Sequence, residues 1–148
     1  VTAVDSSESA IAATMRNAEL NGVEINAIKH NAFDFLKHCE DEYDLIILDP
    51  PSFTRNKKTL KDAMRGYKEI HLRGLKILAR NGILSTYCCS HHATRELFLE
   101  NVVSASVDAK CTLRLIKSPG QRLDHPILPG IPETEYLKGF TFELAPSR

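Results

Sequence analysis

The sequence predicts an α/β fold built on a mostly parallel β-sheet that carries helices on both faces. Short apolar segments alternate along the chain with segments whose apolar residues recur at helical spacing. One expected strand, residues 43–48, is apolar nearly throughout, which is typical of a central strand buried on both faces. The length of 148 residues suits one domain, which we assign to residues 1–148.

Each element is expected from its own local pattern. A strand that ends at Asp5 is followed by Ser6 and Ser7, either of which can cap a helix. Two Asn-Gly pairs, at residues 21–22 and 81–82, are left-handed signals that are expected to end the first and third helices. Further strands are expected at residues 25–29, 43–48, 83–87, 112–116 and 136–144, and further helices at residues 33–38, 59–79 and 94–106.

Composition narrows the functional classes without choosing among them. Lys and Arg total 19, as do Asp and Glu, so only a local basic patch can argue for nucleic acid. No apolar run approaches the roughly 20 residues of a membrane span, and we expect a cytoplasmic protein with no membrane partner. The four cysteines lack the spacing of a disulfide framework. Two cysteines and two histidines fall within residues 88–92, but donors so close together cannot all face one ion, so we expect no metal.

Three polar clusters follow predicted strands at their carboxyl ends: Asp5, residues 49–53 and residues 88–92. In open α/β sheets the ligand lies beyond the carboxyl ends of the strands, so the sequence predicts a site at this edge. Asp5 could accept two hydrogen bonds from a ribose diol, or it could cap the helix that follows. Its position alone does not decide between these two roles.

The turn Asp49-Pro50-Pro51-Ser52-Phe53 is a more specific signal. Its prolines prevent further strand pairing and stiffen the chain beside the aspartate. The carboxylate and nearby carbonyls form a rigid set of acceptors for an amino group or ring nitrogen of a planar base, on which Phe53 could stack. We favour this interpretation over an ordinary Asp-Pro turn with a buried phenylalanine. The predicted substrate contacts in this turn are Pro50, Pro51, Ser52 and Phe53.

Cys89 is the candidate nucleophile. The thiolate is the reactive form of cysteine, and a helix N-terminus or a neighbouring cation favours it. Cys89 lies between a predicted strand end and a helix start, which supplies the first of these. A small apolar core residue is an equally good interpretation from the residues alone.

A basic run follows the aspartate-proline turn. Such runs are most often solvated helix faces, but beside a base-binding turn this one could also contact RNA phosphates. Its predicted phosphate contacts are Lys57, Lys58 and Arg65. The whole run consists of Arg55, Lys57, Lys58, Lys61, Arg65 and Lys68.

With these residues in hand, the chain resembles the bacterial 23S ribosomal RNA cytosine-carbon-5 methyltransferases. The resemblance covers nearly the whole chain and rests on six segments in a fixed order. They are the aspartate-proline turn, Arg65-Gly66-Tyr67-Lys68-Glu69-Ile70, Gly82-Ile83-Leu84, Cys89-Ser90, Asp124-His125-Pro126 and Tyr136-Leu137-Lys138-Gly139-Phe140.

The resemblance implies a Rossmann-like class I methyltransferase sheet, mostly parallel with an antiparallel C-terminal strand. In that family a PUA domain and a small linker domain precede the methyltransferase domain. The glycine-rich loop that cradles the methionine part of the cofactor, and the strand before it, should lie upstream of Val1. We therefore expect a C-terminal fragment, truncated at its N-terminus, that by itself binds S-adenosylmethionine poorly.

The resemblance also implies roles for individual residues. Asp5 becomes the acceptor for the ribose hydroxyls of S-adenosylmethionine, and Asn31-Ala32-Phe33 becomes the adenine-contacting turn, where the family usually has aspartate in place of Asn31. Asp49 is implied to contact the cofactor and orient the base, and Cys89 to be the catalytic thiol. The implied partner is 23S ribosomal RNA.

Two other functions remain open. The chain could belong to a methyltransferase that modifies a guanine or adenine nitrogen, with Cys89 merely packed. It could also be a non-catalytic RNA-binding domain that has kept the fold. A sheet edge left open by the missing strand could pair with a second chain, so a homodimer is a further expectation.

Overall fold

The computed structural model describes residues 1–53 and 57–145, and for Lys57 it describes the backbone only. Arg55 of the basic run lies outside the described residues. The chain forms two compact units, residues 1–40 and residues 41–148, and each is described by itself.

The first unit is a short βαβ arrangement. Strands β1 (Thr2–Asp5) and β2 (Asn26–Lys29) pair in parallel, and helix α1 (Glu8–Leu20) connects them. The hydroxyl of Ser7 accepts from the amide of Ala10, which confirms one of the two predicted caps. Gly22 has a φ of 62°, so the predicted left-handed signal ends this helix. Helix α2 (Ala32–His38) completes the unit.

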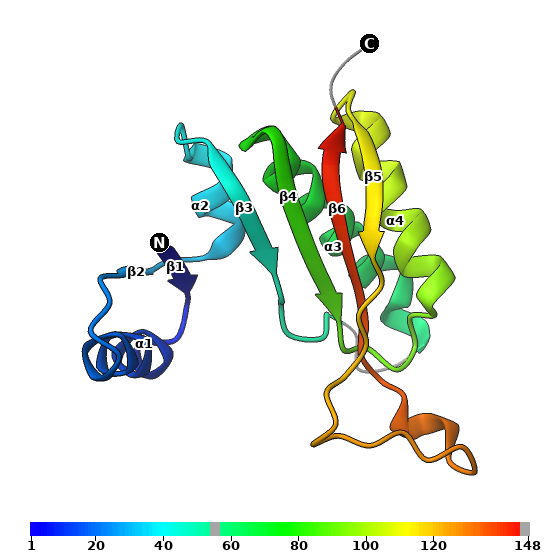
Figure 1. Ribbon diagram of the computed structural model, residues 1–148. Helices are drawn as coiled ribbons and strands as arrows, with labels where there is room; N and C mark the ends of the chain where they lie inside the picture. The colour runs from blue at the N-terminus through cyan, green and yellow to red at the C-terminus, as the bar shows by residue number, and fades with distance from the viewer. Residues whose placement is uncertain (54–56, 146–148) are drawn as a thin grey trace. The chain divides into compact units, whose positions relative to one another are not determined.

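The second unit is a four-stranded sheet in the order β3-β4-β6-β5. Strands β3 (Tyr43–Leu48) and β4 (Leu78–Cys88) are parallel, whereas β6 (Lys138–Ala145) runs antiparallel to both β4 and β5 (Thr112–Lys117). Helices α3 (Leu60–Lys76) and α4 (Arg95–Asp108) lie together on one face of this sheet (Figure 1). Short 3₁₀ turns precede α3 and β6, at Lys57–Thr59 and Pro132–Thr134. A mostly parallel sheet with an antiparallel C-terminal strand was predicted and is confirmed.

The core of the second unit lies between its two helices and the sheet. Tyr67 of α3 and Phe98 of α4 are fully buried, with ring centroids 5.4 Å apart in an edge-to-face arrangement. Phe98 also lies 6.0 Å from Phe140 of β6. Ala63, Tyr67, Ile70 and Gly74, which are spaced three or four residues apart on α3, are all buried.

The predicted end of the third helix was wrong. Helix α3 ends at Lys76, and the Asn81-Gly82 pair lies inside β4, which begins at Leu78. Asn81 has a φ of 60°, so it does adopt the left-handed conformation, but it does so at an irregularity in the β3–β4 pairing. An Asn-Gly pair with a left-handed residue occurs both at helix ends and at strand bulges. Here it lies in a strand, in which Leu78 pairs with Tyr43.

The predicted central position of residues 43–48 was also wrong for the sheet of this unit. Strand β3 lies at the edge of the four-stranded order, and the described helices of the unit cover only one face. Ile46 and Leu48 are buried beneath the helices, whereas Leu45 and Ile47 are 54% and 63% exposed. Apolar content shows that both faces of a strand are hydrophobic, but it does not show which elements cover them.

Candidate functional site

The carboxyl ends of β3 and β4 bring two predicted site residues to one edge of the sheet. Leu48 is paired with Thr86 in the parallel register, so Asp49 and Cys89 follow neighbouring strands in the same direction. Leu48 and Cys88 are buried on the helix side, while Asp49 is exposed and Cys89 is half-buried. Asp49 and Cys89 therefore begin the two segments that leave neighbouring strands at this edge, and both are more exposed than the strand residue before them.

The turn after β3 is anchored by its phenylalanine. The ring of Phe53 lies 4.6 Å from the ring of Tyr67, measured between centroids, and it is half-buried. A Cβ atom added at Gly66 would lie 3.3 Å from the Phe53 ring, so a glycine at this point of α3 lets the ring approach the helix backbone. Phe53 therefore has a structural role, which is to pack this turn against α3, in addition to the base stacking that the sequence predicts. Pro51 and Ser52 are exposed, and Pro50 is half-buried.

The two adjacent cysteines differ sharply in environment. Cys88, the last residue of β4, is 0% exposed, whereas Cys89 is half-buried between β4 and α4. Burial raises the pKa of the Tyr67 hydroxyl, and neighbouring Cys88 raises it further. That hydroxyl and the Ser90 hydroxyl are buried without a hydrogen-bond partner among the described residues. The end of β4 is therefore polar inside as well as at its surface.

Lys138 is a buried cation within the segment at residues 136–140, and the sequence predicted no role for it. It is 7% exposed and pairs with Cys88 across the β4–β6 ladder. Its Nζ donates to the carbonyl oxygen of Ser90 at 2.5 Å, directly after Cys89 in the chain. Burial lowers the pKa of Lys138, and negative charge on Cys88 or Cys89 would act in the opposite direction. Its burial could not be foreseen, because it depends on a partner 48 residues away.

A second missed residue is His71, which is 0% exposed in α3. Its Nε2 lies 2.8 Å from Thr86 Oγ1, and its Nδ1 lies 3.2 Å from Asn101 Oδ1. Asn101 donates its amide nitrogen to Met64 O, so its Oδ1 accepts the Nδ1 proton of the imidazole. Burial lowers the pKa of His71 to about 4, and the imidazole is neutral at neutral pH.

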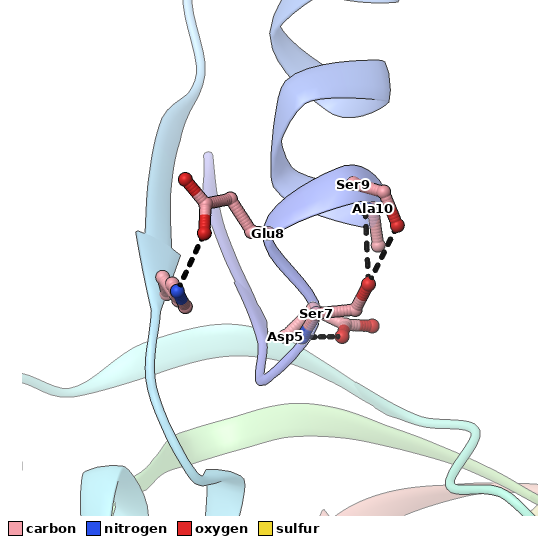
Figure 2. Close-up of polar contacts among 6 residues, drawn as sticks. Asp5, Ser7, Glu8, Ser9 and Ala10 are labelled. Carbon is pink, nitrogen blue, oxygen red and sulfur yellow. Dashed lines mark hydrogen bonds and ion pairs between the residues drawn. The ribbon is translucent and has the colours of Figure 1, made fainter.

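In the first unit, Asp5 ends β1 with an exposed carboxylate. Its Oδ1 accepts a hydrogen bond of 2.7 Å from the amide of Ser7, while Ser7 itself caps α1 (Figure 2). Nearby, Lys29 forms an ion pair with Glu8, with 2.9 Å between Lys29 Nζ and Glu8 Oε2. A carboxylate has about four acceptor positions, so one backbone contact leaves Asp5 able to bind a diol. The hydrogen-bond acceptors at this strand end therefore fit the hydroxyls of a ribose.

Asn31, the predicted adenine contact, has a local structural role. Its Oδ1 accepts from the amides of Phe33 and Asp34 at 2.9 Å and 3.4 Å and so caps α2. Its amide NH₂ group is not used in this cap, and Ala32 and Phe33 are half-buried beside it. Asn31 can thus order the turn and still offer donors to a ligand.

The basic run is partly neutralised by acidic neighbours. Arg65 pairs with Asp62 at 3.0 Å, and Lys68 pairs with Asp108 at 2.7 Å. Lys58 and Lys61 are exposed. Exposed ion pairs of this kind contribute little stability, so Arg65 can exchange Asp62 for another anion at low cost.

Two absences apply to the described part of the chain. Within residues 1–53 and 57–145, no helix combines the length and the apolar character that a membrane span requires. The same residues contain no cluster of three or more metal-ligand side chains.

Comparison with known proteins first defines the class. A putative methyltransferase solved with S-adenosylhomocysteine superposes with a TM-score of 0.81 at 24% identity, covering 96% of this chain and 38% of that one. A methyltransferase homologue from Pyrococcus horikoshii superposes with a TM-score of 0.70 at 21% identity, covering 96% of this chain and 52% of that one. The fold is therefore that of the Rossmann-like methyltransferases, as predicted.

The family follows from the sequence itself. Residues 1–112 match the family described as the methyltransferase small domain, and the chain belongs to that family. Proteins named ribosomal RNA large subunit methyltransferase I are similar, at 36% identity in Klebsiella pneumoniae (strain 342) and 38% in Erwinia tasmaniensis. Each alignment covers 95% of this chain, which spans 36% and 37% of the length of those two relatives. The predicted resemblance to bacterial large-subunit rRNA methyltransferases is confirmed.

Proposed function

We propose that this chain is part of an S-adenosylmethionine-dependent methyltransferase that modifies carbon 5 of a cytosine in 23S ribosomal RNA. The observation that carries the proposal is that a half-buried cysteine follows β4 and an exposed aspartate follows β3, at the same edge of the sheet. Relatives named as large-subunit rRNA methyltransferases support the substrate class.

Carbon 5 of cytosine is a poor nucleophile, so its methylation requires that an enzyme nucleophile first add to the ring and raise the electron density at carbon 5. When the thiolate of Cys89 bonds to carbon 6, the electron pair of the 5,6 double bond moves toward carbon 5. Ring nitrogen 3 takes a proton from solvent as this charge develops, and the Asp49 carboxylate accepts a hydrogen bond from the resulting N3–H group, which orients the ring. S-adenosylmethionine, when bound, supplies an electrophilic methyl group. Carbon 5 would take that methyl group as the bond from the methyl carbon to the sulfonium sulfur breaks. Loss of the carbon-5 proton to a base and of the proton on nitrogen 3 would then let the carbon–sulfur bond to Cys89 break, which restores the 5,6 double bond.

The remaining predicted residues bind rather than react. Asp5 and the turn at residues 31–33 would hold the ribose and adenine of the cofactor, each through chemistry that its local structure leaves available. Pro50, Pro51, Ser52 and Phe53 would shape the base pocket, and Lys57, Lys58 and Arg65 would meet phosphates. RNA suits this site because sequence-specific targets in RNA are unstacked bases in loops.

The test uses the full-length protein and compares two cysteine variants. Cys89→Ala should abolish methyl transfer to rRNA while leaving cofactor affinity within about twofold, because the thiol touches the base and not the cofactor. Cys111→Ala, a half-buried cysteine between α4 and β5, is the matched control and should retain turnover. Full turnover by Cys89→Ala would exclude the covalent route and favour methylation of a base nitrogen at the Asp49 turn.

A further inference from the structure

The buried position of Lys138 costs stability, because it removes a charged side chain from water. The side chain is 7% exposed, and burial lowers its pKa, which means that the charged form is penalised. No carboxylate within the described residues forms an ion pair with it. A protein that buries an ammonium group without a partner carboxylate is usually no more stable than the same protein with an apolar side chain of similar length at that position.

The contacts of Lys138 converge on the segment that presents Cys89. Its Nζ donates to Ser90 O at 2.5 Å, and its backbone position faces Cys88 across the sheet. This hydrogen bond fixes the carbonyl of the residue that follows the candidate nucleophile. The Ser90 hydroxyl, 2% exposed and without a partner among the described residues, adds a second buried polar group at the same turn.

Charged groups of both signs surround the turn. Arg95, at the start of α4, donates to Gly139 O at 3.3 Å and to Ser118 Oγ at 2.6 Å, and it opposes the charge of Lys138. Glu135 favours that charge from the loop before β6, as Cys88 and Cys89 do when ionised. The N-terminus of α4, capped by Thr94, adds the positive end of a 14-residue helix.

We propose that Lys138 is a positioning residue for Cys89: its ammonium holds the Ser90 carbonyl and so fixes the turn that presents the thiol. The proposal rests on the proposed function, in which Cys89 is the nucleophile. It predicts that Lys138 acts on the reactivity of Cys89 and not on the stability of the fold.

The test measures alkylation of Cys89 by iodoacetamide at pH 7, in the 148-residue chain with Cys39 and Cys111 changed to serine. Fragment-ion mass spectrometry separates the adducts of Cys89 from those of buried Cys88. Lys138→Met, which keeps the length and removes the charge, should slow alkylation about tenfold. Lys138→Arg, which keeps a charged donor, should restore most of the rate. Lys117→Met, an exposed lysine of β5 in the same sheet, is the matched control and should leave the rate unchanged.

Urea unfolding of the same variants provides the readout that separates this role from a structural one. Lys138→Met should be as stable as the parent chain or more stable, while its Cys89 reacts more slowly. Alkylation at the parental rate in Lys138→Met would overturn the proposal, as would an equal loss in Lys138→Arg and Lys138→Met. The assay needs neither cofactor nor RNA. An active Cys89→Ala enzyme would therefore refute the proposed function while leaving the alkylation result intact, and an unaffected Lys138→Met would refute only the role of Lys138.

Discussion

The buried histidine of α3 makes the stability of the second unit depend on pH. His71 is neutral in the folded chain, held between Thr86 and Asn101, and its ring lies 5.5 Å from the Phe98 ring. Burial lowers its pKa from 6.5 to about 4. In the unfolded chain the imidazole has its ordinary pKa, so between these two values the unfolded state binds more protons than the folded state. Acid therefore favours unfolding through His71.

The size of the effect follows from the two pKa values. The stabilisation is fully present above about pH 6.5 and is lost as the pH falls toward about 4. With these values the loss between pH 7.5 and pH 5 is about 2 kcal/mol, and the complete loss below pH 4 is about 3 kcal/mol. A domain of this size typically has only about 5–15 kcal/mol to lose, so the change is large enough to measure.

The assay is urea unfolding followed by tyrosine fluorescence at pH 7.5 and pH 5. The chain has no tryptophan, and its four tyrosines all lie in the second unit, so the signal reports on the unit that contains His71. His71→Gln should be less stable than the parent at pH 7.5 but should lose about 2 kcal/mol less on acidification. His91→Gln, an exposed histidine of the same unit, is the control and should keep the parental pH dependence. Equal pH dependence in His71→Gln and the parent would refute the reasoning.

Two further predictions use the same assay at pH 7.5. Gly139→Ala should destabilise the second unit by about 1–3 kcal/mol, because the added Cβ would lie 2.8 Å from both Pro119 O and the Tyr87 ring. Gly120→Ala, whose Cβ would meet nothing nearer than 4.0 Å, should change stability by less than about 0.5 kcal/mol, and equal effects of the two changes would contradict the packing argument. Thr94→Ala should cost about 1 kcal/mol through loss of the bond from the Leu97 amide to the Thr94 hydroxyl, whereas Thr94→Ser should cost little; a neutral Thr94→Ala would show that this cap is not needed.

The sequence predicted best where the decisive interaction is local. The Ser7 cap and the left-handed Gly22 involve atoms within a few residues of one another, and both were found where the pattern indicated. Sequence pattern also indicated the strands and long helices of the described residues, because apolar residues recur in them at strand or helix spacing. The antiparallel C-terminal strand came from the family resemblance and not from periodicity.

The sequence failed where distant segments decide the outcome. Asn81-Gly82 is left-handed as expected, but pairing of Leu78 with Tyr43 makes it part of a strand. His71 and Lys138 are buried with hydrogen-bond partners that are distant in the sequence. His71 bonds to Asn101, which is 30 residues away, and Lys138 bonds to Ser90, which is 48 residues away. A polar residue on an apolar face has no local signal that distinguishes burial with a partner from exposure.

Trapping of the enzyme on RNA that contains 5-fluorocytidine tests the central claim most directly. Fluorine at carbon 5 cannot leave as a proton does, so an enzyme that has methylated this base cannot break its bond to carbon 6. The full-length protein, incubated with S-adenosylmethionine and this RNA, should form a denaturation-resistant complex whose adduct maps by mass spectrometry to Cys89, and Cys89→Ala should form none. An adduct on another residue, or methylated RNA product with no adduct at all, would contradict the assignment of Cys89 as the nucleophile.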